Sequence, residues 1–196
     1  MKFKHLPIIA IVALMVTACE TQPQQSEQEA PAAKLSDKYA KVTLTTDGSR
    51  LSDNEKQMLP LLFKAADIMN DIFWVENFGE KDSLMARISD PDMQLYADIN
   101  YGPWDGINNE ASFVEGVGEK PAGAQFYPQD MTMEEWNAFA DPNKNSQYTM
   151  IVRGDDGQLK CVWYHEYFAE QIEKAASLLE EASTLAGDPE FANYLK

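Results

Sequence analysis

A single apolar stripe near the C-terminal end of the sequence constrains the fold most strongly. Six apolar residues recur there in alternating steps of four and three, which is the spacing of one helix face, and glutamates fill much of the opposite face. These residues are Phe168, Ile172, Ala175, Leu179, Ala182 and Ala186. Because such a helix must bury its apolar face, we expect it to pack against another element. Gly187 ends the helix, and Asp188-Pro189 predicts the start of a further, very short one.

A second long helical pattern begins near residue 52. Ser52 and Glu55 have the spacing of a capping box, and apolar residues then continue at helical spacing to Gly79. Pro60 lies inside this pattern, where its missing N–H predicts a kink or a new helix start. Asp90-Pro91 predicts another helix, with aspartate at the cap and proline in the first turn.

Strand patterns are short and few. Val42 and Leu44 alternate with polar residues, which predicts a short strand near the start of the folded part. Residues 148–153 and 159–163 flank a glycine-rich turn, which predicts a β-hairpin. The predicted fold is therefore α+β and predominantly α-helical, with a short N-terminal strand and one β-hairpin.

A long segment between residues 100 and 130 has no clear helix or strand pattern. It is rich in glycine, proline and aromatic residues, and connections of this length are more often functional than idle. Its aromatic side chains either pin the segment to a core or line a cleft, and we favour pinning because large aromatics contribute more often to cores. These aromatics are Tyr101, Trp104, Phe113, Phe126 and Tyr127. Thr132 and Glu135 then predict a second capping box and a short helix.

The first 18 residues have the composition of an export signal. Two lysines precede an apolar run that is too short to span a bilayer, and small residues follow it immediately before Cys19. This ending resembles the lipobox of bacterial lipoproteins, in which the cysteine is lipidated and becomes the first residue of the mature chain. We therefore predict a lipoprotein signal peptide over residues 1–18 and lipidation at Cys19. The alternative is an ordinary secretory signal cut near Ala18.

Residues 19–38 have the composition of a flexible linker, with many polar residues and two prolines. The predicted domain therefore occupies residues 39–196. The other cysteine, Cys161, lies among apolar residues of the predicted hairpin, where a buried thiol is more common than a nucleophile.

Charge excludes one class of partner. With 32 acidic and 16 basic residues the chain has a formal net charge of −16, so it lacks the basic surface on which nucleic-acid binding depends. A lipid anchor would therefore have to rely on its acyl chains, because anionic headgroups repel an acidic chain.

Residues that carry chemistry are sparse. His165-Glu166 begins like a zinc-binding His-Glu-x-x-His motif, but Ala169 stands where the second histidine would be. His5, the only other histidine, lies in the predicted signal peptide. We therefore predict no metal ligand, no cofactor and no catalytic residue in this sequence.

Several unusual runs resemble one enzyme family. They are residues 99–105, 113–124 and 126–132, with support from Tyr164-His165-Glu166 and from residues 191–195. Together they are similar to the amino-terminal part of bacterial dipeptidyl peptidase III-like zinc metallopeptidases, and the similarity spans residues 39–196.

The resemblance implies a function that this sequence cannot perform alone. Members of the family are several times longer, and they cleave dipeptides from the amino ends of oligopeptides in a cleft between two lobes. Their zinc is bound by a His-Glu-x-x-Gly-His helix or a close relative of it, with a further glutamate from a later helix, and none of these residues matches a position here. The resemblance therefore implies that this sequence is an incomplete part of a larger two-lobed fold and is inactive alone.

Three residues of the irregular segment are weak candidates for substrate binding. They are Tyr101, Trp104 and Asp105, and the competing interpretation is that they fix the shape of the segment. The expected partners are the remainder of the same polypeptide, an oligopeptide substrate and a membrane reached through the lipid anchor.

The resemblance places the protein in a bacterial envelope, exported and lipid-anchored. The alternative function is a non-catalytic envelope lipoprotein that binds peptide or a protein partner through the aromatic segment.

Overall fold

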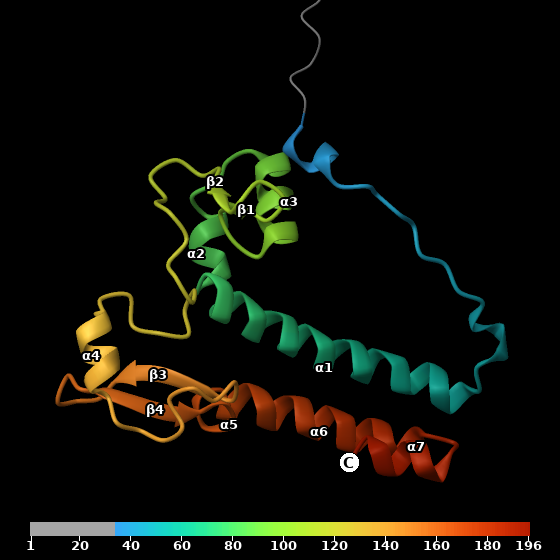
Figure 1. The fold of residues 1–196 in the computed structure, drawn as a ribbon. Helices are drawn as coiled ribbons and strands as arrows, with labels where there is room; N and C mark the ends of the chain where they lie inside the picture. The colour runs from blue at the N-terminus through green and yellow to red at the C-terminus, as the bar shows by residue number, and fades with distance from the viewer. Residues whose placement is uncertain (1–33) are drawn as a thin grey trace, which may run out of the picture. The chain divides into compact units, whose positions relative to one another are not determined.

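The computed structural model describes residues 34–196, which form one unit (Figure 1). The predictions for the signal peptide, for Cys19 and for most of the linker lie outside the described residues. In chain order the elements are η1 (Leu35–Lys38), η2 (Gly48–Arg50), α1 (Asp53–Asn77), α2 (Lys81–Met85), α3 (Pro91–Asn100), β1 (Trp104–Asp105), β2 (Ala111–Ser112), α4 (Met133–Ala138), β3 (Thr149–Arg153), β4 (Leu159–Trp163), α5 (Tyr164–Tyr167), α6 (Ala169–Leu185) and α7 (Pro189–Tyr194). The prediction of a mainly helical α+β fold is confirmed.

Helix α1 begins at the predicted capping box. The Glu55 backbone N–H donates to Ser52 Oγ at 3.2 Å, and the Ser52 N–H donates to Glu55 Oε2 at 2.7 Å. The prediction of a new helix start at Pro60 is wrong, because α1 runs through this residue as one helix. Buried contacts at Met58 and Ala65, on either side of the proline, hold the helix together and outweigh the lost backbone hydrogen bond.

Helix α6 packs along α1, and this contact buries the apolar stripe (Figure 1). Ala175 and Ala182 lie in the interface, and their small side chains let the two helices approach closely. The short helix α7 folds back onto the end of α6 and buries Leu195 beside Met58. The prediction that the stripe packs against another element is confirmed, and α1 is that element.

Three apolar clusters follow one another along α1. The first cluster joins Met58 to α6 and to Leu195, which follows α7. The second joins Ile72 to β3 and α6. The third joins Trp74 to α2 and α3. Helix α1 is therefore the common support of the whole unit. None of the helices within residues 34–196 is long and apolar enough to cross a membrane.

The predicted hairpin is confirmed, and a second one is present. Strands β3 and β4 pair antiparallel, with Met150 opposite Val162. The outer edge of β3 is partly covered, because the Ile151 N–H donates to the Phe126 carbonyl at 3.0 Å. Strands β1 and β2 form a smaller hairpin inside the segment that showed no regular pattern in the sequence. Its strands are two residues long, too short for periodicity to reveal them.

The predicted N-terminal strand is absent. Residues 40–46, which we call the strap, connect η1 to η2 as extended backbone and pair with no other strand of the described chain (Figure 1). Every residue of the strap is exposed, including Val42 at 71% and Leu44 at 91%. The alternating pattern is real, but a strand also needs a neighbour to pair with, and no described segment lies alongside.

The last four residues of the predicted linker form η1, which is fixed to α3 and β1. The Ser36 hydroxyl donates to Asp92, Lys38 Nζ lies 2.7 Å from Asp105 Oδ2, and the Tyr39 hydroxyl donates to Asn100 Oδ1 at 2.9 Å. We call these three contacts the clasp. They hold the N-terminal end of the described chain against the end of the unit that carries α3.

Candidate functional site

Tyr101 points toward α1. It follows α3 with a left-handed backbone (φ 53°), and its hydroxyl donates to Asn70 Oδ1 at 2.6 Å. Its ring meets the ring of Phe73 edge-on, with centroids 4.6 Å apart. The next residue, Gly102, has φ +154°, and an added Cβ would lie 3.3 Å from the Trp104 ring, so only glycine fits this approach. Tyr101 therefore fixes the turn after α3 onto α1.

Trp104 is buried at the start of the small hairpin. Its side chain is 6% exposed, and its ring lies 5.7 Å from the ring of Phe78 at the end of α1. Nε1 donates to the carbonyl of Gly118 at 3.0 Å, which ties two parts of the 100–130 segment together. Lys120 Nζ lies 5.9 Å from the ring centroid, a distance at which the cation is attracted to the ring face.

Asp105 is a buried carboxylate whose oxygens are engaged. It is 3% exposed, with Lys38 Nζ at 2.7 Å from Oδ2 and the Ile107 N–H donating to Oδ1 at 3.1 Å. Burial alone would raise the pKa of Asp105, but these donors outweigh burial and hold the pKa below its ordinary value. Burial, and then the neighbouring Asp105 carboxylate, raises the pKa of Tyr96.

The three predicted binding candidates therefore do not converge on one site. Neighbouring side chains of a strand point to opposite faces, so Trp104 and Asp105 face different partners, while Tyr101 faces α1. The polar groups of Tyr101, Trp104 and Asp105 already have partners within the unit. The interpretation that the aromatic residues pin the segment fits this geometry, and a role of these residues in substrate binding stays a prediction.

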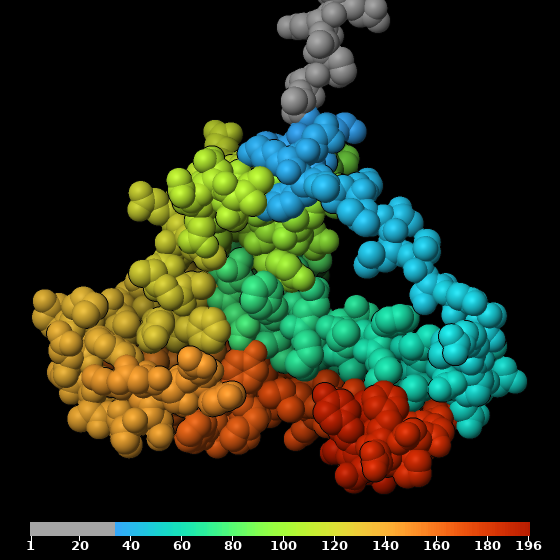
Figure 2. Space-filling view, turned by 45° about the vertical axis from the view of Figure 1, so that its right-hand side comes forward, coloured from blue at the N-terminus to red at the C-terminus, as the bar shows by residue number. Residues whose placement is uncertain are grey.

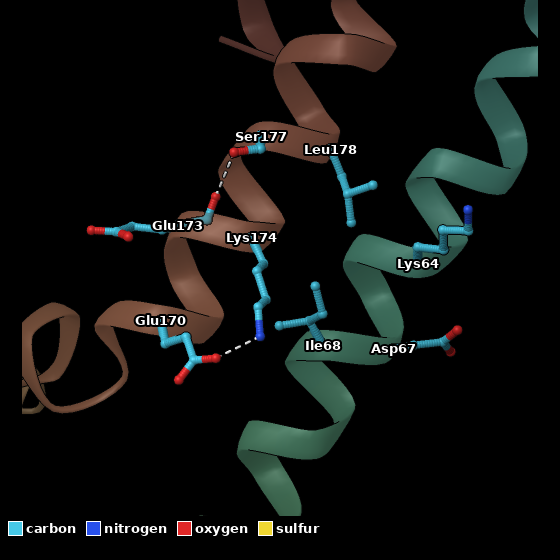
Figure 3. A pocket seen from close by; sticks show the side chains of 8 residues that line it. All are labelled: Lys64, Asp67, Ile68, Glu170, Glu173, Lys174, Ser177 and Leu178. Carbon is cyan, nitrogen blue, oxygen red and sulfur yellow. Dashed lines mark hydrogen bonds and ion pairs between the residues drawn. The ribbon is translucent and has the colours of Figure 1, made fainter.

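A groove lies between α1 and α6 (Figure 3). It has a volume of about 690 Å³, and its apolar part comes from Ile68 on α1 and Leu178 on α6. Charged and hydroxyl side chains of both helices surround these two residues in the close-up view. The remaining lining residues are Lys64, Asp67, Glu170, Glu173, Lys174 and Ser177.

The polar groups on the α6 side of the groove are used within their own helix. Lys174 Nζ lies 2.7 Å from Glu170 Oε1, and this pairing holds the pKa of Glu170 below its ordinary value. The Ser177 hydroxyl donates to the Glu173 carbonyl at 2.9 Å, so no base is positioned to activate it as a nucleophile.

A buried carboxylate lies near the end of α1. Glu76 is 9% exposed and stands beside Tyr164 of α5, and burial together with this carboxylate raises the pKa of Tyr164 well above its usual range. The Gln125 N–H donates to the Glu76 carbonyl at 2.9 Å. Glu76 therefore joins α1, the 100–130 segment and α5 at one point, with the tyrosine held protonated.

His165 and Cys161 each have different neighbours. His165 stacks on Trp163, with ring centroids 6.5 Å apart. Burial, with a smaller contribution from Asp141, raises the pKa of the Cys161 thiol to about 11, so the thiol is protonated at neutral pH. Within residues 34–196, no three His, Cys, Asp or Glu side chains are grouped so that they could hold a metal ion.

The sequence did not predict the clasp. Its bonds join residues separated by 56 to 67 positions, and single serines, lysines and tyrosines carry no local pattern that would indicate such contacts. The groove between α1 and α6 was likewise not predicted, although both helices were, because the sequence does not show which helix faces the stripe.

Comparison with solved structures gives two strong matches. A structure of dipeptidyl peptidase III from Caldithrix abyssi is 33% identical, with a TM-score of 0.72, and the match covers 80% of this chain and 32% of that one. A structure of dipeptidyl peptidase III from Corallococcus sp. strain EGB is 27% identical, with a TM-score of 0.74, over 82% of this chain and 32% of that one.

The sequence comparison is more distant. A protein named Nudix hydrolase 3 from Arabidopsis thaliana is 23% identical over 220 residues, covering 81% of this chain and 28% of that protein. No protein-family model matches the sequence. The chain thus spans about a third of the length of each solved structure that it matches. The resemblance predicted from the sequence is confirmed, because this chain is similar to about a third of each dipeptidyl peptidase III structure.

Proposed function

We propose that this chain is the N-terminal segment of an exported, lipid-anchored, zinc-dependent dipeptidyl peptidase that removes dipeptides from the amino ends of oligopeptides. The match to two dipeptidyl peptidase III structures carries the proposal, because it extends over at least 80% of this chain at TM-scores of 0.72 and 0.74. Since the match covers 32% of each of those chains, the activity is assigned to a longer polypeptide of which this segment is one part.

Within that enzyme, the segment acts as a structural support. Its polar side chains at Tyr101 and Asp105 are bonded to other parts of the same unit, and His165 is stacked on Trp163. Hydrolysis assisted by zinc needs several protein ligands, an open position for water and a general base within reach. We assign these groups to the remainder of the polypeptide, and we expect the segment alone to be inactive.

The anchor is a separate part of the proposal. The sequence before Cys19 supports lipidation at that residue, and an acidic chain of net charge −16 depends on acyl chains rather than on lipid headgroups for its attachment. The variant Cys19→Ser should move the protein from the membrane fraction to the soluble fraction. Cys161→Ser is the matched control, because it removes the other cysteine and should leave the protein in the membrane fraction.

The decisive experiment measures the mass and the activity of the native product. Membranes of the source cells are blotted under denaturing conditions with an antibody raised against residues 171–186, which gives the mass. A second, undenatured sample is captured with the same antibody from detergent-solubilised membranes and assayed for dipeptide release from an oligopeptide. We expect a species several times heavier than 22.1 kDa, with activity that a zinc chelator abolishes and added zinc restores. A product near 22.1 kDa without such activity would contradict the proposal and favour a non-catalytic lipoprotein that binds peptide or a partner protein.

A further inference from the structure

The strap is extended but has no partner strand. None of the backbone N–H or C=O groups of residues 40–46 makes a hydrogen bond within the part of the chain that the structure describes. At one end of the strap, η1 is held by the clasp. At the other end, the chain passes through η2, where the Asp47 side chain accepts a hydrogen bond from the Ser49 N–H at 2.9 Å, into the capped start of α1. The strap is therefore held at both ends with its backbone groups available for pairing.

The side chains of the strap are those of a half-buried strand. Val42 and Leu44 lie two positions apart, so in extended backbone they project to the same side, while Thr43 projects to the other. Val42 is 71% exposed and Leu44 is 91% exposed. An alternating pattern of this kind is typical of a strand with one covered face, and in this unit that face is uncovered.

Space for a partner is present beside the strap. Figure 2 shows the strap standing clear of α1, with open space between them. At the start of the strap a hollow of about 470 Å³ lies between η1 and α3, and its walls include the exposed side chains of Leu95 and Ile99. A strand laid along the strap would have this apolar hollow at one end.

We propose that the strap is one strand of a β-pair whose other strand comes from the remaining part of the dipeptidyl peptidase III-like polypeptide. The partner is an extended segment that pairs with residues 41–45 and covers Val42 and Leu44. This inference rests on the proposed function, because the match covers only 32% of each solved structure and the remainder of such a polypeptide would provide the second strand. A strand is the fitting partner, because only extended backbone can pair with a row of open N–H and C=O groups.

Two other occupants fit the strap less well. A second copy of this chain would bring together two strongly acidic molecules, and Lys41 beside the apolar pair is a residue type that discourages pairing of identical edges. A substrate peptide binds transiently and would leave Val42 and Leu44 exposed in the free enzyme. A strand of the same polypeptide covers them permanently, and it is present at high effective concentration.

Amide hydrogen exchange on the native membrane product gives the first test. Pairing along one edge protects alternate amides, so we expect at least tenfold slower exchange at every second residue of 41–45 than at the residues between them. Fast exchange at all five residues would overturn the proposal.

Two neighbouring proline substitutions give the second test, in the same native polypeptide. Val42→Pro and Thr43→Pro each remove one N–H, but only one of two successive N–H groups in a strand faces its partner. We expect one variant to lose activity on heating at least tenfold faster than the other, with the milder variant close to the parent. Equal inactivation rates for the two variants would overturn the pairing.

The alternatives have their own signatures. A native mass twice that of one polypeptide, lost in the more sensitive proline variant, would assign the strap to a second copy and overturn the proposal. A raised KM with unchanged heat resistance would assign the strap to substrate and also overturn it. Failure of the proposed function is seen separately, as a native product near 22.1 kDa without zinc-dependent dipeptide release.

Discussion

The strap and the 100–130 segment are both connections with little regular structure, yet they differ in what holds them. The 100–130 segment is anchored by Trp104, whose ring is buried, and by Asp105, whose carboxylate is paired with Lys38. The strap makes no backbone hydrogen bond to any residue of 34–196 and exposes both of its large apolar side chains. The comparison teaches that order in a connection comes from partners elsewhere in the chain, not from the pattern of the connection itself.

The difference has an energetic meaning. Ordering each residue costs conformational free energy, which burial of large side chains and satisfied hydrogen bonds must offset. In the 100–130 segment, buried aromatic rings supply this compensation. In the strap, nothing within residues 40–46 supplies it, so its extended form depends on the two fixed ends and, as we propose, on a strand that pairs with it.

The largest effect is expected where the 100–130 segment loses its buried anchor. Trp104→Ala removes a buried ring and the hydrogen bond to the Gly118 carbonyl, and we expect it to lower the free energy of unfolding by about 3–5 kcal/mol. Urea unfolding of this chain measures the change. Leu44→Ala is the matched control, because a side chain 91% exposed should contribute within about 0.5 kcal/mol. Similar losses for both variants would contradict the distinction between the two regions.

Asp105 gives a prediction that depends on pH. Its pKa in the folded chain is below the ordinary value, so its ionised form stabilises the fold above about pH 4, and this contribution is lost as the pH falls through the lowered folded pKa. Asp105→Asn should lower the melting temperature at neutral pH and flatten its decline in acid. Asp67→Asn on α1 is the control, because that side chain is exposed. Parallel acid profiles for the parent and Asp105→Asn would count against the role of this carboxylate.

Arg153 anchors the far end of the 100–130 segment. Its guanidinium binds Asp130 through Nε at 2.9 Å, Glu135 through Nη1 at 3.0 Å, and the Gly157 carbonyl at 2.9 Å. A lysine cannot reproduce this fork, so Arg153→Lys should speed amide exchange in α4 several-fold while leaving α6 unchanged. Lys160→Arg on the exposed side of β4 is the control. Unchanged exchange in α4 would show that the fork does not hold this end of the segment.

The smallest expected effect concerns the caps that follow the two regions. The strap leads to Ser52 at the start of α1, and the 100–130 segment leads to Thr132 at the start of α4. Each capping box has both of its hydrogen bonds, so Ser52→Ala and Thr132→Ala should each cost about 1 kcal/mol in urea unfolding. The serine and threonine variants should therefore behave alike, and a large difference between them would show that the preceding connection changes what a cap contributes.

Local signals predicted the local parts of this fold. The capping boxes at Ser52 and Thr132, the aspartate-proline start of α3 and the hairpin of β3 and β4 all depend on residues within a few positions of each other. Such contacts are encoded in short windows of sequence, which is why they could be read directly. The apolar stripe predicted that α6 is packed, although it did not show that α1 is the partner.

Non-local contacts account for the differences. The strap has a strand pattern without a partner, whereas the two-residue strands β1 and β2 have partners without a pattern. At the candidate site, the sequence favoured a pinning role for Trp104, which the burial of its side chain fits, but it gave no sign that Lys38 would lie against Asp105, 67 positions away. A single lysine has no periodicity, so only the folded chain reveals its partner.

The clasp also decides how the unit would respond to a pulling force. A force applied at Lys34 reaches the hydrogen bonds of Ser36, Lys38 and Tyr39 before it reaches any helix that belongs to the core. The strap beyond them is already extended, so once those bonds rupture the load passes through the strap and η2 to the first turn of α1. A pulling force at this end would therefore load the clasp first and the helix pair of α1 and α6 only after its three bonds had broken.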